Sequence, residues 1–311
     1  MRLTCEAFAK VNRTLLVLGK RPDGYHELDT VFQSVDLADR LAFEDPEELK
    51  DFELRVSDPS LAGEDNLVAR AARALGAEAG VPCRGRVTLD KRIPWGAGLG
   101  GGSADAAAAL RGFAALWQLA VPEGDLHRLA ADLGSDVPFF LIGGRARGTG
   151  RGEVLTPLAD GPPDWLVLLS PSFPLSTPAV YRALGAGALT GPAAPSILSG
   201  SCAELFPDRN DLEPAAESLR GEVRQLRDQL LAAGAQTARL SGSGSTVFGV
   251  FPDPASASRA AAALTGSLPG GTRITVVKAL TREEYQRRST PGVETEETGV
   301  RTSGKSAVLG G

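Results

Sequence analysis

A run of glycines in front of an alanine-rich segment is the feature that most constrains how this chain of 311 residues folds. Five of the seven residues from 96 to 102 are glycine, and the segment Ala104–Leu110 follows at once. Glycine lets backbone amides crowd around a ligand at positive φ, and a helix N-terminus adds roughly half a positive charge. The pattern predicts a phosphate-binding loop rather than a flexible linker. The expected contact residues are Pro94, Gly96, Ala97, Gly98, Leu99, Gly100, Gly101, Gly102 and Ser103.

The mixture of strand and helix patterns along the chain indicates an α+β fold. The expected strands are 3–19, 28–43, 87–93, 165–169, 237–240, 246–251 and 273–280. The expected helices are 67–78, 104–119 with Ser103 as its cap, 123–133, 217–233 and 255–264. Because proline and glycine become dense after about residue 157, we predict domains at 1–155 and 156–285, followed by a disordered tail at 286–311.

Composition excludes several classes of protein. A net charge of −5 argues against a nucleic-acid binder. The three cysteines are far apart and the chain has only two histidines, so neither a disulfide framework nor a Cys/His metal site is expected. No apolar run approaches 18 residues and the N-terminus lacks the apolar core of a signal peptide. We therefore expect a cytoplasmic protein without membrane or nucleic-acid partners.

Two common phosphate loops do not fit the glycine run. A Walker A loop needs a lysine directly after its last glycine, and here Ser103 follows Gly102. A dinucleotide fingerprint is formally present as Gly96, Gly98 and Gly101, but any glycine run produces it. The dinucleotide-binding fold also requires an acidic residue about 20 positions after the fingerprint, and residues 114–121 contain none.

The loop resembles the central ATP loop of the GHMP small-molecule kinases. Two further segments stand where that superfamily has its other motifs, Ala9–Asn12 in the first strand and the glycine segment Leu240–Phe248. The resemblance implies a two-lobed fold, with an N-terminal lobe like domain 2 of ribosomal protein S5 and a ferredoxin-like C-terminal lobe. It also implies ATP as co-substrate and Mg²⁺ carried with the nucleotide, and no protein ligand to the metal is assigned.

Narrower motifs resemble the 4-diphosphocytidyl-2-C-methyl-D-erythritol kinases over about residues 5–280. They are Lys10-x-Asn12, Arg21–Glu27, Leu133–Pro138 and Arg209–Pro214. The resemblance implies ATP-dependent phosphorylation of the 2-hydroxyl of a cytidine-diphosphate-linked polyol in the non-mevalonate isoprenoid pathway, by a monomer or weak homodimer. Arg13 departs from the pattern, because an apolar or aromatic residue is more usual there, and Asp105 stands where Asn is frequent.

Lys10 and Asp136 are the candidate catalytic residues. The resemblance implies that Asp136 accepts the proton of the substrate hydroxyl and that Lys10 lies beside it, keeping the carboxylate ionised. Local sequence alone also allows Asp136 to cap a short helix, since proline follows closely. It likewise allows Lys10 to extend its ammonium to solvent from the edge of a strand.

The candidate substrate-binding residues are Asn12, Tyr25, His26, Tyr181, Gly242, Ser243 and Gly244. Asn12 lies two residues after Lys10 and projects from the same face of a strand. The resemblance implies that cytosine stacks on Tyr25 with His26 bonded to the base edge, and Tyr181 is the candidate for the opposite face. Tyr181 can instead be a packing residue, and Ser241–Ser245 can be a plain turn, support the first glycine loop or face the substrate diphosphate.

Two other functions stay open at this point. Another GHMP kinase, acting on a mevalonate-like or homoserine-like alcohol, would not need the aromatic residues at 25, 26 and 181. A non-catalytic nucleotide-binding regulator would not need both Lys10 and Asp136.

Overall fold

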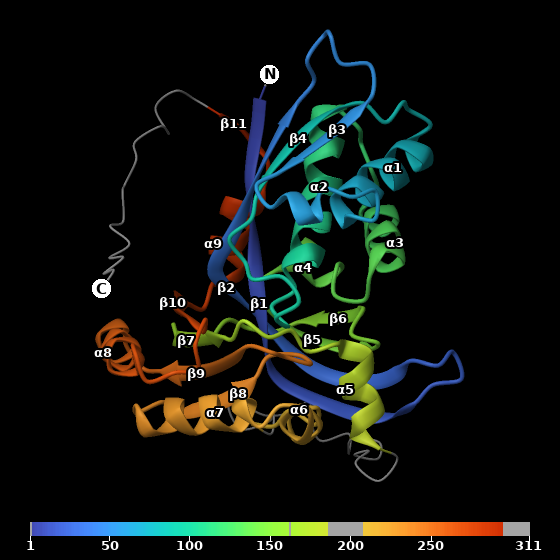
Figure 1. The fold of residues 1–311 in the computed structure, drawn as a ribbon. Coiled ribbons are helices and arrows are strands. Elements are labelled where there is room, and N and C mark those ends of the chain that lie inside the picture. The colour runs from blue at the N-terminus through green and yellow to red at the C-terminus, as the bar shows by residue number, and fades with distance from the viewer. Residues whose placement is uncertain (1, 162, 186–207, 295–311) are drawn as a thin grey trace.

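The structure, a computed structural model, describes residues 2–161, 163–185 and 208–294. It has two lobes, each built on its own sheet, and the first two strands of the chain run from one lobe into the other (Figure 1). The α+β two-lobed fold expected from the sequence is therefore confirmed.

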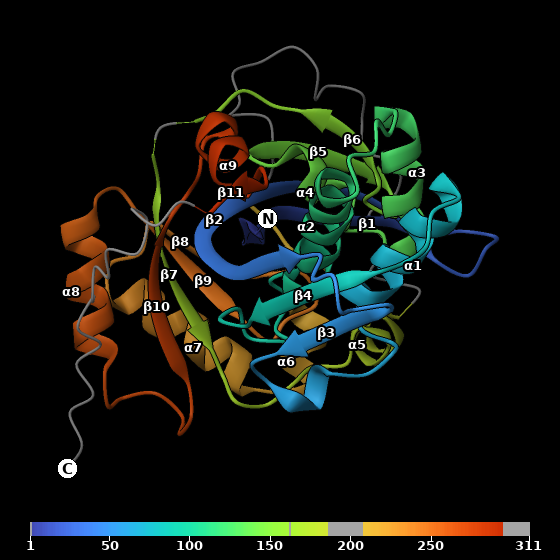
Figure 2. The ribbon, with the colours of Figure 1, turned by 90° about the horizontal axis from the view of Figure 1, so that it is seen from above.

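The first sheet has the order β11-β1-β2-β4-β3, with β5 paired to β2 and β6 paired to β5. Its strands are β1 Arg2–Lys20, β2 His26–Glu44, β3 Phe52–Val56, β4 Gly85–Asp90, β5 Arg145–Gly150, β6 Val154–Pro157 and β11 Gly292–Val293. Only β3 and β4 pair in parallel among these strands as described. The helices α1 Leu67–Ala79, α2 Gly101–Leu116 and α3 Glu123–Leu133 lie together on one side of this sheet (Figure 2).

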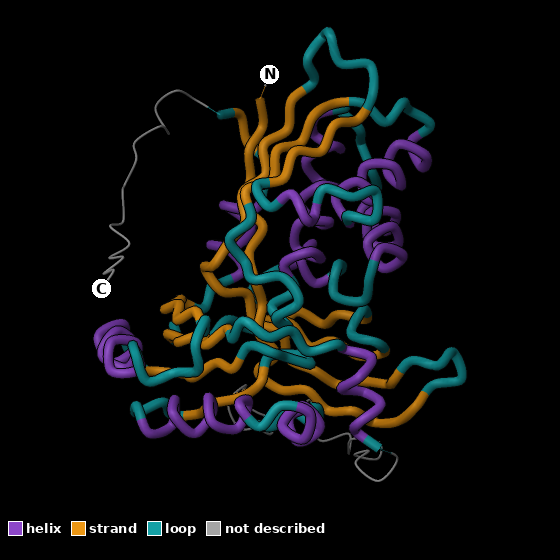
Figure 3. The backbone as a smooth tube through the Cα atoms, in the orientation of Figure 1, coloured by secondary structure: helices purple, strands orange, loops and turns teal. Residues whose placement is uncertain are grey.

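The second sheet has the order β10-β7-β9-β8 and is antiparallel throughout. Its strands are β7 Trp165–Ser170, β8 Thr237–Leu240, β9 Val247–Phe251 and β10 Arg273–Lys278. The helices of this lobe are α5 Thr177–Leu184, α6 Glu213–Leu219, α7 Glu222–Ala232 and α8 Pro254–Leu264. Figure 3 shows α6 and α7 along one side of the sheet.

A third apolar cluster joins the two lobes under the glycine loop. It combines Ala9 and Val11 of β1 with Leu166 of β7 and with Ala97 and Leu99 from the loop itself. Both loop side chains are almost fully buried. The apolar residues between the glycines therefore anchor the loop, while its backbone stays available to a ligand.

Helix α2 begins earlier than expected, at Gly101 instead of Ala104. Its N-cap residue is Gly100, which has a φ of 72° and makes no side-chain capping bond. The prediction of Ser103 as a helix cap is therefore wrong, because Ser103 lies inside the first turn. The unbonded amides at the start of the helix belong to the glycine run, as an anion site requires.

Two expectations for the second half need correction. The single helix expected at 217–233 is two helices, because Arg220 adopts an extended conformation between α6 and α7. The prediction of disorder from residue 286 is wrong for the described residues 286–294, because α9 (Arg282–Ser289) is stabilised by a capping box between Thr281 and Glu284 and β11 pairs with β1. Residues 295–311 lie outside the described residues.

The boundary expected near residue 155 falls inside β6. The chain passes from the first sheet to the second between β6 and β7, and α9 and β11 then return it to the first lobe. Two remaining short elements are the 3₁₀ helix Pro59–Leu61 and α4 Phe139–Ile142.

Candidate active site

A cavity of about 820 Å³ lies where β1, β2, the glycine loop and α5 meet. Most predicted catalytic and substrate-binding residues and two glycines of the predicted ATP loop line it, although they come from distant parts of the chain. They are Lys10, Asn12, Tyr25, His26, Gly98, Gly100, Asp136, Tyr181, Gly242 and Ser243. The predicted residues outside this lining are Pro94, Gly96, Ala97, Leu99, Gly101, Gly102, Ser103 and Gly244.

Lys10 and Asp136 form an ion pair in this cavity, with 3.3 Å between Lys10 Nζ and Asp136 Oδ2. Lys10 is only 3% exposed, whereas a third of the Asp136 side chain is exposed. The buried ammonium therefore has the partner that burial of a charge requires. Its alternative interpretation, an ammonium extended to solvent at a strand edge, is not what the structure contains.

Asn12 extends the pair on the same face of β1. Lys10 Nζ donates to Asn12 Oδ1 over 2.7 Å, and Asn12 Nδ2 donates to Thr30 Oγ1 over 2.7 Å. Thr30 Oγ1 in turn donates to the Thr14 carbonyl over 2.6 Å. This chain of bonds fixes the amide so that its oxygen faces the ammonium.

Asp136 lies in the turn between α3 and α4 and makes no capping bond to α4, whose N-cap residue is Pro138. The carboxylate is therefore not engaged in holding the helix. A carboxylate that is one-third exposed and ion-paired at the wall of a cavity can accept a proton from a bound hydroxyl group.

The first glycine loop has a backbone that only glycine adopts readily. Gly98 has a φ of 78°, and a Cβ atom there would lie 2.1 Å from the Ser241 carbonyl oxygen. The backbone of Lys10 donates to the Leu99 carbonyl over 2.9 Å, which ties the loop to β1 next to the ion pair. The loop therefore passes directly over Lys10.

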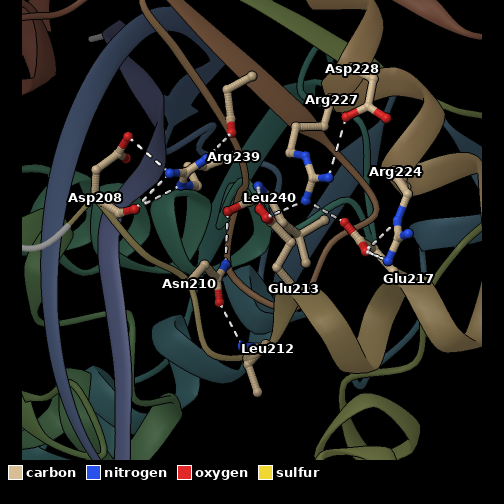
Figure 4. A network of polar contacts seen from close by, with 11 residues as sticks. Asp208, Asn210, Leu212, Glu213, Glu217, Arg224, Arg227, Asp228, Arg239 and Leu240 are labelled. Atoms are coloured by element: carbon tan, nitrogen blue, oxygen red, sulfur yellow. Dashed lines mark hydrogen bonds and ion pairs between the residues drawn. The ribbon is translucent and has the colours of Figure 1, made fainter. Parts of the chain in front are cut away.

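The second glycine segment supports the first. Ser241 Oγ donates to the Gly98 carbonyl over 2.9 Å, and the Thr246 amide donates to the Ala97 carbonyl over 3.1 Å. Asn210 Nδ2 donates to the Leu240 carbonyl over 2.8 Å (Figure 4). It also donates to the Gly242 carbonyl over 2.8 Å, and so holds the segment in place. Of the three interpretations of this segment, these bonds favour the one in which it supports the first loop.

Three aromatic residues stand at the mouth of the cavity, in pairings that the sequence did not predict. The His26 ring stacks on Tyr181, with centroids 4.7 Å apart and an angle of 22°. Tyr25 is 55% exposed, and the Arg151 guanidinium lies 4.9 Å from its ring centre. Burial and then the nearby Lys20 lower the pKa of His26, so that its neutral form is favoured at pH 7.

Three cations that sequence reasoning missed also line the cavity, namely Lys20, Arg151 and Arg182. Arg151 stands in a tight turn between two glycines of positive φ, and a Cβ atom on Gly152 would lie 4.0 Å from Asp136 Oδ1. The only available signal was the glycine spacing, which indicated a break in the chain but no ligand. Asp136 is the single acidic residue in this lining as far as the chain is described, so the cavity suits an anionic substrate.

Within the described part of the chain, no three His, Cys, Asp or Glu side chains are grouped closely enough to hold a metal ion. A search of the same residues for a helix long and apolar enough to cross a membrane also finds none.

Comparison with known proteins matches both lobes to one superfamily. Residues 66–144 match the GHMP kinases N terminal domain and residues 193–270 match the GHMP kinases C terminal domain. A 4-diphosphocytidyl-2-C-methyl-D-erythritol kinase of Moorella thermoacetica is 47% identical over 86% of this chain and 96% of its own length. One of the same name from Parvibaculum lavamentivorans is 44% identical over 86% of the chain and 95% of its own length.

Solved structures agree with these matches. A crystal structure of 4-(cytidine 5'-diphospho)-2C-methyl-D-erythritol kinase has a TM-score of 0.74 and 41% identity, and it covers 88% of this chain and 98% of its own. A homoserine kinase from Cytophaga hutchinsonii has a TM-score of 0.70 at 18% identity, with coverage of 94% and 97%. The second likeness concerns the fold alone.

Proposed function

Since the chain belongs to the GHMP kinases and, within them, to the 4-diphosphocytidyl-2-C-methyl-D-erythritol kinase family, we propose that Lys10 and Asp136 are its catalytic pair. Family membership makes the protein a small-molecule kinase with ATP as co-substrate. The reaction is phosphorylation of the 2-hydroxyl of 4-diphosphocytidyl-2-C-methyl-D-erythritol in isoprenoid synthesis. The observation that carries the proposal is the Lys10–Asp136 ion pair at the wall of the cavity, directly under the glycine loop.

Phosphoryl transfer needs positioning and charge neutralisation more than covalent chemistry from the protein. We infer that the carboxylate of Asp136 takes the proton of the acceptor hydroxyl as its oxygen attacks the γ-phosphorus. Lys10 orients that carboxylate through the ion pair, while Asn12 holds Lys10 through its amide oxygen. The backbone amides of the glycine loop and of the first turn of α2 bind the phosphates of ATP.

The aromatic and cationic residues at the cavity mouth suit the other end of the acceptor. We infer that cytosine stacks on Tyr25, that His26 bonds to the base edge, and that Tyr181 packs against His26 or the base. Lys20 and Arg151 supply positive charge for the diphosphate. A mevalonate-like or homoserine-like alcohol would leave these groups without a role, and a non-catalytic regulator would leave the ion pair without one.

Magnesium, a cytoplasmic location and a monomeric or weakly dimeric state stay predictions. Mg²⁺ neutralises charge on the nucleotide phosphates when it is bound.

Replacing Asp136 with Asn tests the catalytic assignment. The amide keeps the shape of the side chain but cannot accept the proton, so kcat should fall by about 10²–10⁴, the usual contribution of general base catalysis. The KM for ATP should change little, because the phosphates bind to the loop. Steady-state assays of ADP release with the proposed acceptor measure both constants.

Asp132→Asn is the matched control, because Asp132 is an exposed carboxylate in α3, four residues earlier. It should keep the wild-type kcat. If Asp136→Asn retains more than about a tenth of the wild-type kcat, the general-base role is wrong.

A further inference from the structure

A buried group of three charges lies behind the glycine loop, outside the catalytic cavity. Lys91 Nζ donates to Asp105 Oδ2 over 2.7 Å and also to Asp39 Oδ2. Asp39 is fully buried, Asp105 is 3% exposed, and the Lys91 side chain is 8% exposed. The mechanism above uses none of these residues, although the chain has only six lysines.

The group contacts the glycine loop at both of its ends. Asp39 Oδ1 accepts from the backbone amides of Arg92 and Ile93 over 2.5 and 2.9 Å, and these residues lead directly into Pro94. Asp105 belongs to the first turns of α2, where the loop ends. A Cβ atom on Gly101 would lie 3.3 Å from Lys91 Nζ, so the ammonium lies right behind the start of the helix.

Neither charge attraction nor stability explains this group. The Lys91 ammonium is shared by two carboxyl groups, so the group has no net positive charge with which to attract phosphates. The pKa of Asp105 is raised to about 8, mainly by burial and to a smaller extent by the neighbouring Asp39. Buried ion groups of this kind are often no more stable than apolar residues of the same volume. We therefore explain the group by its geometry, because it holds the two ends of the loop at a fixed distance from each other.

We propose that Lys91 is a positioning residue for the phosphate loop: its ammonium ties Asp39, which holds the entrance of the loop, to Asp105 in the helix at its exit. The ligand whose binding depends on this spacing is the polyphosphate of ATP, and in this the inference rests on the proposed function. Loss of one tie lets the two ends separate, so that the amides no longer converge on the phosphates.

Three variants test this inference. Asp105→Leu removes one acceptor of Lys91 but leaves the neutral Lys91–Asp39 pair, so the fold should survive. It should raise the Kd for the β,γ-imido analogue of ATP by about 10- to 100-fold, the range for a misplaced binding group. Asp105→Asn keeps an oxygen acceptor and should restore the Kd to near the wild-type value. Lys91→Met should weaken binding at least as much as Asp105→Leu, if it folds.

Gly112→Ala is the control for general damage to α2. It crowds the same helix against Phe43, far along from the loop, and should leave the Kd for the analogue unchanged. Calorimetric titration measures the Kd, and the KM for ATP should rise in parallel while kcat at saturating ATP stays within about threefold, as expected for lost uniform binding.

The inference is overturned if Asp105→Leu binds the analogue like wild type, if Asp105→Asn is as weak as Asp105→Leu, or if Gly112→Ala is equally weakened. Failure of the proposed acceptor is a different result, because wild type would then bind the analogue and leave the acceptor unphosphorylated. A wild-type protein that binds no ATP analogue would overturn both proposals.

Discussion

At the scale of single residues, the side chains that line the cavity differ sharply in burial between the ion pair and the aromatic residues. Lys10 and Asn12 are buried and bonded to one another, so their positions are set before substrate arrives. Tyr25 is more than half exposed, and the contact on its ring is Arg151. An exposed aromatic ring is available for stacking, whereas a buried one is committed to the core.

Replacing Tyr25 with Ala tests whether the cytosine of the acceptor stacks on this ring. Stacking of a base on an aromatic ring contributes about 1–3 kcal/mol, so the KM for the acceptor should rise about 5- to 150-fold. The KM for ATP should stay the same, and Tyr25→Phe, which keeps the ring, should behave like wild type. Steady-state kinetics with the concentration of each substrate varied in turn gives both KM values. An unchanged KM for the acceptor in Tyr25→Ala would mean that the cytosine does not stack on Tyr25.

At the scale of elements, helix α2 connects the loop to the core of the first lobe. The small side chains that follow the loop let the helix lie close to the sheet, and all of them are buried, namely Ala104, Ala106, Ala107, Ala108 and Ala109. Gly112 continues this close approach, because a Cβ atom there would lie 2.2 Å from the Phe43 ring. Phe43 is itself fixed edge-on against Phe113, so it has no room to turn aside.

Gly112→Ala should therefore destabilise the protein. Alanine improves helix propensity by up to about 1 kcal/mol, but overpacking a rigid core costs about 1–3 kcal/mol, and with contacts this short we expect the overpacking to dominate. Gly124→Ala in α3 is the matched control, because nothing lies within 4 Å of its Cβ position. It should be neutral or slightly stabilising. Urea unfolding of both variants gives the two free energies, and equal stability of the pair would contradict the packing argument.

At the scale of the whole molecule, β1 and β2 hold the two lobes together. Leu15 and Val17, near the end of β1, pack in the core of the second lobe, and the Val17 amide donates to Asp211 Oδ2 over 2.9 Å. Arg13, the residue that departs from the family pattern, lies in a β-bulge of the same strand and pairs with Asp164 just before β7, over 3.0 Å. Its guanidinium lies outside the lining of the catalytic cavity and links β1 to the second sheet.

Breaking this pair should reduce the stability of the whole protein. Asp164→Ala leaves the guanidinium of Arg13 without its carboxylate and should lower the free energy of unfolding by about 1–3 kcal/mol. Arg13→Leu should cost less, because Asp164 keeps Arg145 at 3.9 Å. The double variant should cost less than the sum of the two. Additivity within about 0.5 kcal/mol in urea unfolding would show that the pair does not couple the lobes.

The features of the site that are local in the chain could be predicted from the sequence. The glycine run, the helix after it and the shared face of Lys10 and Asn12 follow from backbone preferences and from the period of a strand. The capping box of α9 was also written in the sequence, although we expected a disordered tail there. The family resemblance supplied the partner of Lys10.

What only the tertiary structure decided are the contacts between distant segments. The ammonium of Lys10 meets a carboxylate 126 positions later, Asn210 holds the second glycine segment, and Arg151 reaches Tyr25. Local propensities carry no information on such pairs, because they form only when segments that are far apart in the chain pack against one another. The chain itself determined the kinds of chemical group at the site, and the packing of distant segments decided which of them meet.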